Sequence, residues 1–163
     1  MTAGERPAPA LAVAIALADP ASADARHCLT QYFAELARRF PEGFDLTRDG
    51  AGNASDLAPP AGCLLIARLA DAPVGCAGLR ALEPGIGEVK RMWVAPAARG
   101  CGIGRRLLGE LEQVARARGM RALRLDTHSA LEEALSLYRS CGYAGIARFN
   151  ANPYAHHWFE KRL

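Results

Sequence analysis

The sequence predicts one α/β domain with a mixed sheet and the element order β-α-β-β-β-α-β-α-β-β. Short apolar runs typical of strands alternate with longer segments that have apolar residues at helical spacing, and Gly, Pro and Asp separate them. The chain has 163 residues, of which 50% are hydrophobic and 23% charged, as expected for one globular core. Residues 1–9 are expected to form a disordered tail and residues 10–163 the single domain.

The first quarter of the domain is expected to form a strand and a helix. Leu11–Leu17 has the composition of a strand. Asp19 looks like the N-cap of the next helix, with Pro20 at its first position, and the helix is expected to end before Pro41. Residues 41–61 are rich in Gly, Pro, Asp and Asn, which predicts a loop or a short irregular helix that contributes to a binding site.

Three strands and a helix follow. Their predicted spans are Cys63–Leu69, Val74–Leu82 and Glu88–Val94, with turns at residues 71–73 and 84–85. An amphipathic helix then starts after Gly102 and ends at Gly119. With the strand Ala122–Thr127 it predicts a right-handed parallel strand–helix–strand crossover.

The last elements are a helix and two strands. Ser129 and Glu132 have the spacing of a capping box that opens the helix, and Gly142 closes it. The two final strands are expected at Tyr143–Asn150 and Ala155–Arg162.

Composition excludes several classes of partner. A net charge of +3 with scattered arginines argues against nucleic acid, and no apolar run approaches the ~20 residues of a membrane span. The five cysteines lack a C-x-x-C spacing, which favours free thiols and a cytoplasmic location. Residues 11–18, followed by Ala-Ser-Ala, resemble a secretory signal, but Glu5 offsets Arg6, so a first strand is the preferred interpretation.

A glycine-rich turn after the third of these strands carries most of the functional information. Gly100, Gly102 and Gly104 alternate where a strand passes into a helix, so backbone N–H groups can converge on an anion such as a pyrophosphate. Arg99 and Arg105 can add positive charge. A dinucleotide fingerprint would need glycine at position 105, and a P-loop would need lysine after Gly104. A structural turn without a ligand remains an alternative.

Three motifs together resemble the GNAT superfamily of N-acetyltransferases. Arg99-x-x-Gly102-x-Gly104 is similar to its coenzyme A pyrophosphate motif, and Glu88–Val94 to its fourth strand. Ala134-x-x-x-Tyr138-x-x-x-Gly142-Tyr143 resembles the end of its last helix. The resemblance is strong over residues 88–143 and implies a GNAT-like acyl-CoA N-acyltransferase fold with acetyl-CoA as cosubstrate.

The resemblance also implies a division of labour along this segment. The backbone of Met92, Trp93 and Val94 would pair with the pantetheine arm, which enters where the strands Glu88–Val94 and Ala122–Thr127 separate. The pyrophosphate would be bound by the N–H groups of Arg99, Gly100, Cys101, Gly102, Ile103, Gly104 and Arg105.

Two catalytic residues follow from the same resemblance. Tyr138 would donate a proton to the departing thiolate, although by spacing alone it is a core tyrosine. A general base is expected, because deprotonating an amine of pKa near 10.4 costs about 4–5 kcal/mol at neutral pH. Glu88 is the best placed carboxylate, since it begins the strand that resembles the superfamily's base-bearing strand. The alternative for Glu88 is an ion pair with Lys90. Many members have asparagine where this chain has Leu131, and the missing contact is either absent or supplied by Thr127, His128 or Ser129.

No metal is expected, because His156 and His157 point to opposite faces of a strand and His27 has no partner in the sequence. The resemblance places the acceptor pocket on the first helix, the 41–61 loop and the 150–154 turn, with the lining side chains Tyr32, Phe44, His128 and Tyr154.

The predicted function is transfer of an acetyl group from acetyl-CoA to a primary amine of a small molecule, an amino acid or a protein, by direct attack in a ternary complex. One alternative is a non-catalytic acyl-CoA-binding regulatory domain, which the missing asparagine favours. Another is a nucleotide-binding enzyme with Asp126 as ribose partner, which Arg105 disfavours. The sequence leaves open the acceptor, the acyl chain length and whether the protein is a monomer or a homodimer.

Overall fold

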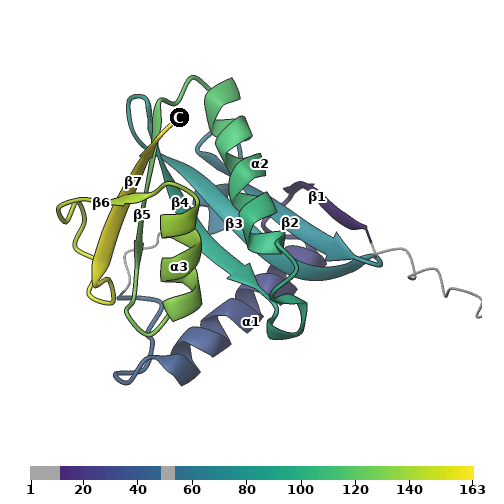
Figure 1. The fold of residues 1–163 in the computed structure, drawn as a ribbon. Helices are drawn as coiled ribbons and strands as arrows, with labels where there is room; N and C mark the ends of the chain where they lie inside the picture. Colours follow the sequence, from purple (N-terminus) through teal and green to yellow (C-terminus); the bar gives the residue numbers. More distant parts are fainter. Residues whose placement is uncertain (1–11, 49–53) are drawn as a thin grey trace, which may run out of the picture.

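The computed structural model describes residues 12–48 and 54–163. The predicted tail at residues 1–9 therefore lies outside the described residues. The elements follow the predicted order (Figure 1): β1 (Val13–Ala18), α1 (Ala23–Arg39), the 3₁₀ turn η1 (Ala54–Leu57), β2 (Gly62–Leu69), β3 (Ala72–Glu83), β4 (Ile86–Val94), the 3₁₀ turn η2 (Pro96–Ala98), α2 (Ile103–Ala117), β5 (Ala122–Thr127), α3 (Glu132–Ser140), β6 (Ala144–Gly145) and β7 (His157–Arg162).

The described strands form one mixed sheet in the order β1-β2-β3-β4-β5-β7-β6. β1 to β4 form an antiparallel meander, and the β5–β7 and β7–β6 pairs are also antiparallel. The central pair, β4 and β5, is parallel and is connected through α2, so the predicted parallel crossover is present. None of the helices among these residues is long and apolar enough to span a membrane.

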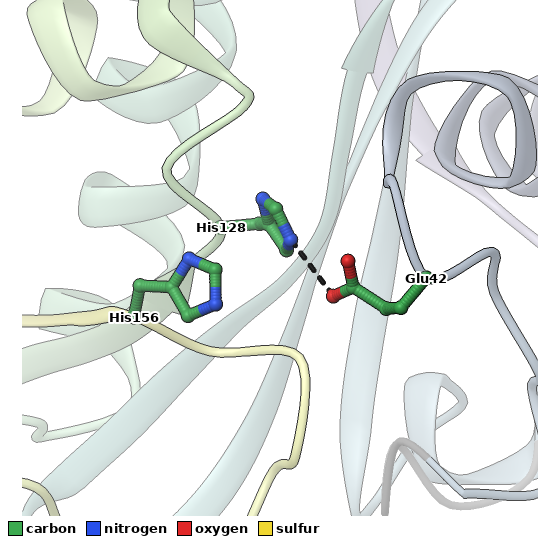
Figure 2. A group of neighbouring side chains, drawn as sticks. All are labelled: Glu42, His128 and His156. Atoms are coloured by element: carbon green, nitrogen blue, oxygen red, sulfur yellow. Dashed lines mark hydrogen bonds and ion pairs between the residues drawn. The ribbon is translucent and has the colours of Figure 1, made fainter.

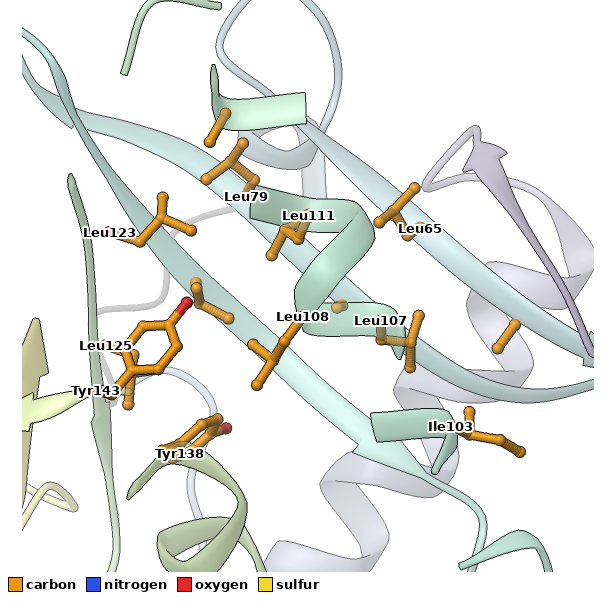
Figure 3. Close-up of a cluster of buried hydrophobic side chains, with 14 of the residues drawn as sticks. Leu65, Leu79, Ile103, Leu107, Leu108, Leu111, Leu123, Leu125, Tyr138 and Tyr143 are labelled. Carbon is orange, nitrogen blue, oxygen red and sulfur yellow. The ribbon is translucent and has the colours of Figure 1, made fainter. Parts of the chain in front are cut away.

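Helices cover both faces of the sheet (Figure 1). On one face, Leu107, Leu108 and Leu111 of α2 are at most 1% exposed and pack on the strands, together with Tyr138 and Tyr143 from the region of α3 (Figure 3). On the opposite face, α1 buries a smaller cluster. Ala25, Cys28 and Leu29 of α1 pack there against the strand residues Leu64, Ile66, Cys76 and Trp93. Successive side chains of each strand point to opposite faces of the sheet and pack in two apolar layers, as expected for a sheet covered on both sides.

Two helix starts differ from the sequence prediction. Asp19 closes a turn by accepting a hydrogen bond from the Ala21 N–H (2.9 Å), and the N-cap of α1 is Ser22, whose side chain accepts from the Ala25 N–H (3.3 Å). The prediction of Asp19 as N-cap was therefore wrong. The predicted capping box of α3 is also wrong, because Leu131 is the N-cap and makes no side-chain cap.

The penultimate strand is shorter than predicted, since β6 contains two residues in place of Tyr143–Asn150. After β6 the chain leaves the sheet, and Asn150 at the end of the predicted strand is held by side-chain hydrogen bonds. The Asn150 amide donates to Asp126, and its Oδ1 accepts from the Trp158 indole N–H at 2.9 Å. These bonds hold the 150–154 turn against the end of β5, where it becomes a wall of the functional site.

Candidate active site

The site lies where the two central parallel strands separate. β4 and β5 pair through Ile86–Glu88 and Ala122–Arg124. No described strand pairs with the β5 side of β4 beyond Glu88, so the backbone of residues 92–94 faces an opening. This is the splayed geometry that the sequence predicted for entry of the pantetheine arm.

A β-bulge gives this opening its shape. The register between β3 and β4 shifts between Cys76 and Gly78, and Arg91 has a left-handed backbone with φ of 55°. Val89 packs in the core under α2, whereas Trp93 packs against α1 on the other face. Without an extra residue between them, these two side chains would share a face. Because of the bulge, the side chain of Trp93 faces α1 and not α2.

The glycine turn connects β4 to α2. Gly100 and Gly102 adopt left-handed backbone conformations, with φ of 83° and 76°. Gly102 is the N-cap of α2 and has no side chain to cap the first N–H groups of the helix. A Cβ atom at either glycine would meet no heavy atom within 4 Å, so both border open space. The turn therefore presents uncapped N–H donors at the positive end of a helix, which suits a phosphate group.

A cavity of about 250 Å³, which we call the donor cavity, lies against this turn. Every residue that the resemblance assigned to cofactor binding lines this cavity except Cys101, which is exposed and is not among the lining residues. The residues from β4, the turn and α2 are Met92, Trp93, Val94, Ala98, Arg99, Gly100, Gly102, Ile103, Gly104 and Arg105. Tyr32, Glu35 and Leu36 of α1 and the start of α3 complete the walls.

The two arginines of the turn have different environments. The Arg99 Nη2 lies 2.7 and 2.8 Å from the two carboxylate oxygens of Glu35, and its Nε donates to the Val94 carbonyl at 3.0 Å. Its charge is therefore compensated, and it ties the turn to α1. Arg105 is exposed and donates to the neutral Ser140 hydroxyl at 2.8 Å. Of these two cations, Arg105 is the one whose charge is available to an anionic ligand.

A second cavity of about 80 Å³, the acceptor cavity, adjoins the first. Tyr32, Phe44, His128 and Tyr154, the four side chains predicted for the acceptor pocket, all line it. The two cavities share five lining residues from α1, β4 and the start of α3, namely Tyr32, Leu36, Met92, Leu131 and Ala134. Leu131, the residue that replaces the usual asparagine, is thus an apolar part of this shared wall.

Tyr138 lines the acceptor cavity one helical turn after Ala134, which lines both cavities. Its ring packs in the core against Tyr143 and Phe159, and the residue is 5% exposed. Among the residues that the structure describes, none forms a hydrogen bond with its hydroxyl. Burial raises the pKa of Tyr138, and the nearby charges of Asp126 and Glu133 raise it further, so the hydroxyl keeps its proton at neutral pH.

Glu88 lies outside the residues that line either cavity. One of its carboxylate oxygens is 3.1 Å from Nη2 of Arg80 and 3.2 Å from Nζ of Lys90, and the side chain is 1% exposed. The ion pair with Lys90 was the alternative that the sequence offered. These contacts favour a structural ion-pair role for Glu88 over that of general base.

A buried histidine joins three distant segments near the acceptor cavity (Figure 2). The His128 Nε2 lies 2.9 Å from a carboxylate oxygen of Glu42, and its ring stacks on Phe40 and approaches His156. Candidate ligand atoms of Glu42, His128 and His156 lie within 4.8 Å of one another. However, the His128 Nδ1 accepts the Ala130 N–H at 2.9 Å, so its proton is on Nε2 and is donated to Glu42. That arrangement fits a hydrogen-bonded cluster better than a metal centre.

Asp126 is the feature of the site that sequence reasoning missed, because it was considered only as a ribose partner. It lines the acceptor cavity, and its carboxylate accepts hydrogen bonds from the side-chain amides of Asn150 and Asn152. The alternation within β5 puts it on the opposite face from the buried Leu125, which is the signal that was available.

Comparison with known proteins agrees with this geometry. Residues 29–143 match the profile of the Acetyltransferase (GNAT) family. The chain is 39% identical over 127 residues to an IAA acetyltransferase from Azospirillum brasilense, covering 77% of this chain and 82% of that protein. It is 40% identical over 127 residues to the N-alpha-acetyltransferase RimI of Mycobacterium tuberculosis, covering 76% and 75% of the two chains.

Solved structures show the same fold. A GNAT acetyltransferase from Staphylococcus aureus superimposes with a TM-score of 0.78 at 17% identity and covers 93% of this chain and 99% of its own. A protein from Bacillus anthracis assigned as a streptothricin acetyltransferase was solved with acetyl-coenzyme A and gives a TM-score of 0.58 at 19% identity, over 66% of this chain and 65% of its own.

Fold and site together define an acyltransferase built around an uncapped helix start. The chain belongs to the GNAT acetyltransferase family, and it is an acyltransferase enzyme.

Proposed function

We propose that this protein transfers the acetyl group of acetyl-CoA to a primary amine by direct attack while both substrates are bound. The observation that supports this most strongly is the shared wall of the donor and acceptor cavities, with Tyr138 in the acceptor cavity one helical turn after Ala134 of that wall. Two substrates in adjoining cavities have their reacting groups held together, which removes much of the entropic cost of a two-substrate reaction.

The donor cavity suits acetyl-CoA in each of its parts. The N–H groups that follow Gly102 supply uncapped donors for the diphosphate, and Arg105 adds a positive charge. The free edge of residues 92–94 offers backbone groups to the amide-containing arm, in the manner of an added strand. When bound, acetyl-CoA supplies a thioester, whose carbonyl carbon accepts the amine.

Tyr138 is the residue we assign to the departing sulfur. Its hydroxyl is protonated at neutral pH and is not engaged by any described residue, so it can donate a hydrogen bond and a proton to a developing thiolate. The neutral amine nitrogen forms a bond with the acetyl carbon, the carbon–sulfur bond breaks, and the sulfur takes the proton of Tyr138. The proton that the nitrogen loses returns to the Tyr138 phenolate, so the products are the amide and the free thiol of coenzyme A.

A thiol-release assay with acetyl-CoA and a panel of primary amines tests the proposal, with mass spectrometry to detect the N-acetylated product. We expect release that depends on the amine. Calorimetric binding of coenzyme A without release for any amine would instead support the non-catalytic alternative. Absence of coenzyme A binding would contradict the assignment of the donor cavity itself.

A further inference from the structure

Opposite charges flank the gap where β4 and β5 part. Lys90 and Asp126 each lie two residues beyond the last paired positions, Glu88 and Arg124. Both line the acceptor cavity, and no ion pair within 4.0 Å joins these two described residues. The acceptor cavity thus has the cation Lys90 on one strand and the anion Asp126 on the other, and the two do not form an ion pair with each other.

The carboxylate of Asp126 is rigidly placed and only partly satisfied. The side-chain amides of Asn150 and Asn152 each donate to one of its oxygens. A carboxylate has about four acceptor sites, so about two remain for a further donor. Asp126 lines the same cavity as Tyr32 and Ala134 of the shared wall, and its charge adds to the larger effect of burial in raising the pKa of Tyr138. An ammonium group bound to Asp126 would therefore lie beside the donor cavity. It attacks the thioester after it has released one proton to solvent, as a neutral amine that still donates a hydrogen bond to Asp126.

The cationic side of the cavity has spare hydrogen-bonding capacity. Lys90 Nζ lies 3.2 Å from Glu88, and an ammonium group has three N–H donors. Arg80 also contacts Glu88, at 3.1 Å, and lies 3.9 Å from Asp56, so Lys90 shares the Glu88 carboxylate with a second cation. Lys90 is therefore able to bind a second carboxylate in the cavity.

Aromatic rings form the remaining wall. Phe40 and Phe44 lie within 6.0 Å of each other between ring centroids, and Tyr154 lies 5.0 Å from Phe44. All three line the acceptor cavity. These rings make one wall of the cavity apolar, so an apolar substrate side chain can pack against them.

We infer that the acceptor is a free amino acid with an aromatic or large apolar side chain, whose ammonium group binds Asp126 and whose carboxylate binds Lys90. The inference rests on the proposed N-acetyltransferase function and specifies its substrate class. It distinguishes the substrate from a simple amine, which lacks the carboxylate, and from a protein amine, which lacks a free carboxylate beside its nitrogen.

The test compares L-phenylalanine with two analogues that each lack one recognised group. Phenethylamine lacks the carboxylate, and L-alanine lacks the ring. For the wild-type enzyme we expect kcat/KM to be at least about tenfold higher for phenylalanine than for either analogue. Phenethylamine loses a charged hydrogen bond, and alanine loses the apolar contact of the ring.

Two variants assign the recognition to residues. Lys90→Gln should lower kcat/KM about tenfold for phenylalanine and leave it nearly unchanged for phenethylamine. Asp126→Asn should lower it for both amines. Glu110→Gln, an exposed carboxamide replacement on α2, serves as the matched control and should change neither. Loss of stability in Lys90→Gln would affect both substrates alike, so the selective effect separates recognition from folding.

Several outcomes would overturn the inference. Equal kcat/KM for phenylalanine and phenethylamine, or equal losses for both in Lys90→Gln, would remove the carboxylate site. Faster acetylation of a short peptide with amino-terminal phenylalanine would point to a protein substrate instead. These results leave the proposed N-acetyltransferase function standing, whereas failure to acetylate any amine despite binding of acetyl-CoA would overturn both.

Discussion

The donor and acceptor cavities adjoin each other but are built in different ways. The donor cavity is formed mainly by one continuous stretch, residues 92–105, whose contribution is a free strand edge and uncapped backbone N–H groups. The acceptor cavity is formed by side chains from α1, the segment after it, β4, the end of β5 and the 152–154 turn. We therefore expect the donor cavity to recognise its ligand mainly through the main chain, and the acceptor cavity through side chains that the fold brings together.

This difference separates what backbone geometry supplies from what particular side chains supply. Main-chain donors at a helix start bind a diphosphate whatever the neighbouring side chains are, provided that glycine permits the backbone geometry. The acceptor cavity depends on the identities of residues such as Asp126 and Phe44. We therefore expect variants of the donor side to affect every reaction of the enzyme, and variants of the acceptor side to affect some substrates more than others.

The largest effect is expected for Gly102→Val. A β-branched side chain at a φ of 76° is strongly disfavoured and would extend into the space in front of α2. We expect kcat/KM for acetyl-CoA to fall by about 100-fold or more, equally for all amines. Steady-state kinetics with acetyl-CoA varied measures this.

The control is Gly109→Ala in the same helix. Gly109 has an ordinary helical φ, and a Cβ there meets no atom within 4 Å. It should leave kinetics unchanged and stabilise the protein by about 0.5–1 kcal/mol. Wild-type kinetics in Gly102→Val would mean that the N–H groups of this turn do not bind the diphosphate.

Tyr138→Phe tests the proposed proton donor in the acceptor cavity. Removal of the hydroxyl keeps the ring packing with Tyr143 and Phe159 but deletes the proton donor. We expect kcat to fall at least about tenfold, with little change in KM for acetyl-CoA. Thermal denaturation should show a folded variant of similar stability, and unchanged turnover would rule out the general-acid role.

Glu88→Gln tests a residue that lies in neither cavity. Loss of its charge weakens contacts with Arg80 and Lys90, so we expect the free energy of unfolding to fall by about 1.5–3 kcal/mol. The acidic limb of the pH profile of kcat/KM should keep its position. Disappearance of that limb in the variant would instead identify Glu88 as the general base, because a carboxylate base is inactive when protonated.

The smallest effect concerns stability at alkaline pH. Burial raises the pKa of Tyr32, Tyr138 and Tyr143 in the folded protein. Unfolded tyrosines ionise near pH 10, so above about pH 10 the unfolded state releases protons that the folded state retains, and stability declines. Urea denaturation at about pH 8 and about pH 10.5 measures the decline. Tyr143→Phe should make it shallower, and a stability independent of pH would show that these hydroxyls are not desolvated.

The same comparison explains what the sequence could predict. The element order and the donor cavity rest on local signals, namely glycine spacing, apolar periodicity and the Arg99–Gly104 motif, and these residues stay neighbours in the fold. Capping was predicted less well, because Asp19 and Ser22 are both good N-cap residues and only the folded backbone decides between them.

The acceptor side depended on contacts that join distant residues. Asp126 meets Asn150 and Asn152, and His128 meets Glu42 at a separation of 86 residues. No local pattern encodes such pairs. The extended prediction for 143–150 failed for the same reason, because Asn150 is held by side-chain hydrogen bonds to Asp126 of β5 and Trp158 of β7 and not by backbone strand pairing.

The central claim is that the two cavities hold both substrates at once, and bisubstrate initial-rate kinetics tests it most directly. With acetyl-CoA and the best amine of the panel varied together, the account predicts double-reciprocal lines that intersect, as direct transfer in a ternary complex requires. Parallel lines, together with an acetylated form of the enzyme in mass spectra after incubation with acetyl-CoA alone, would contradict it.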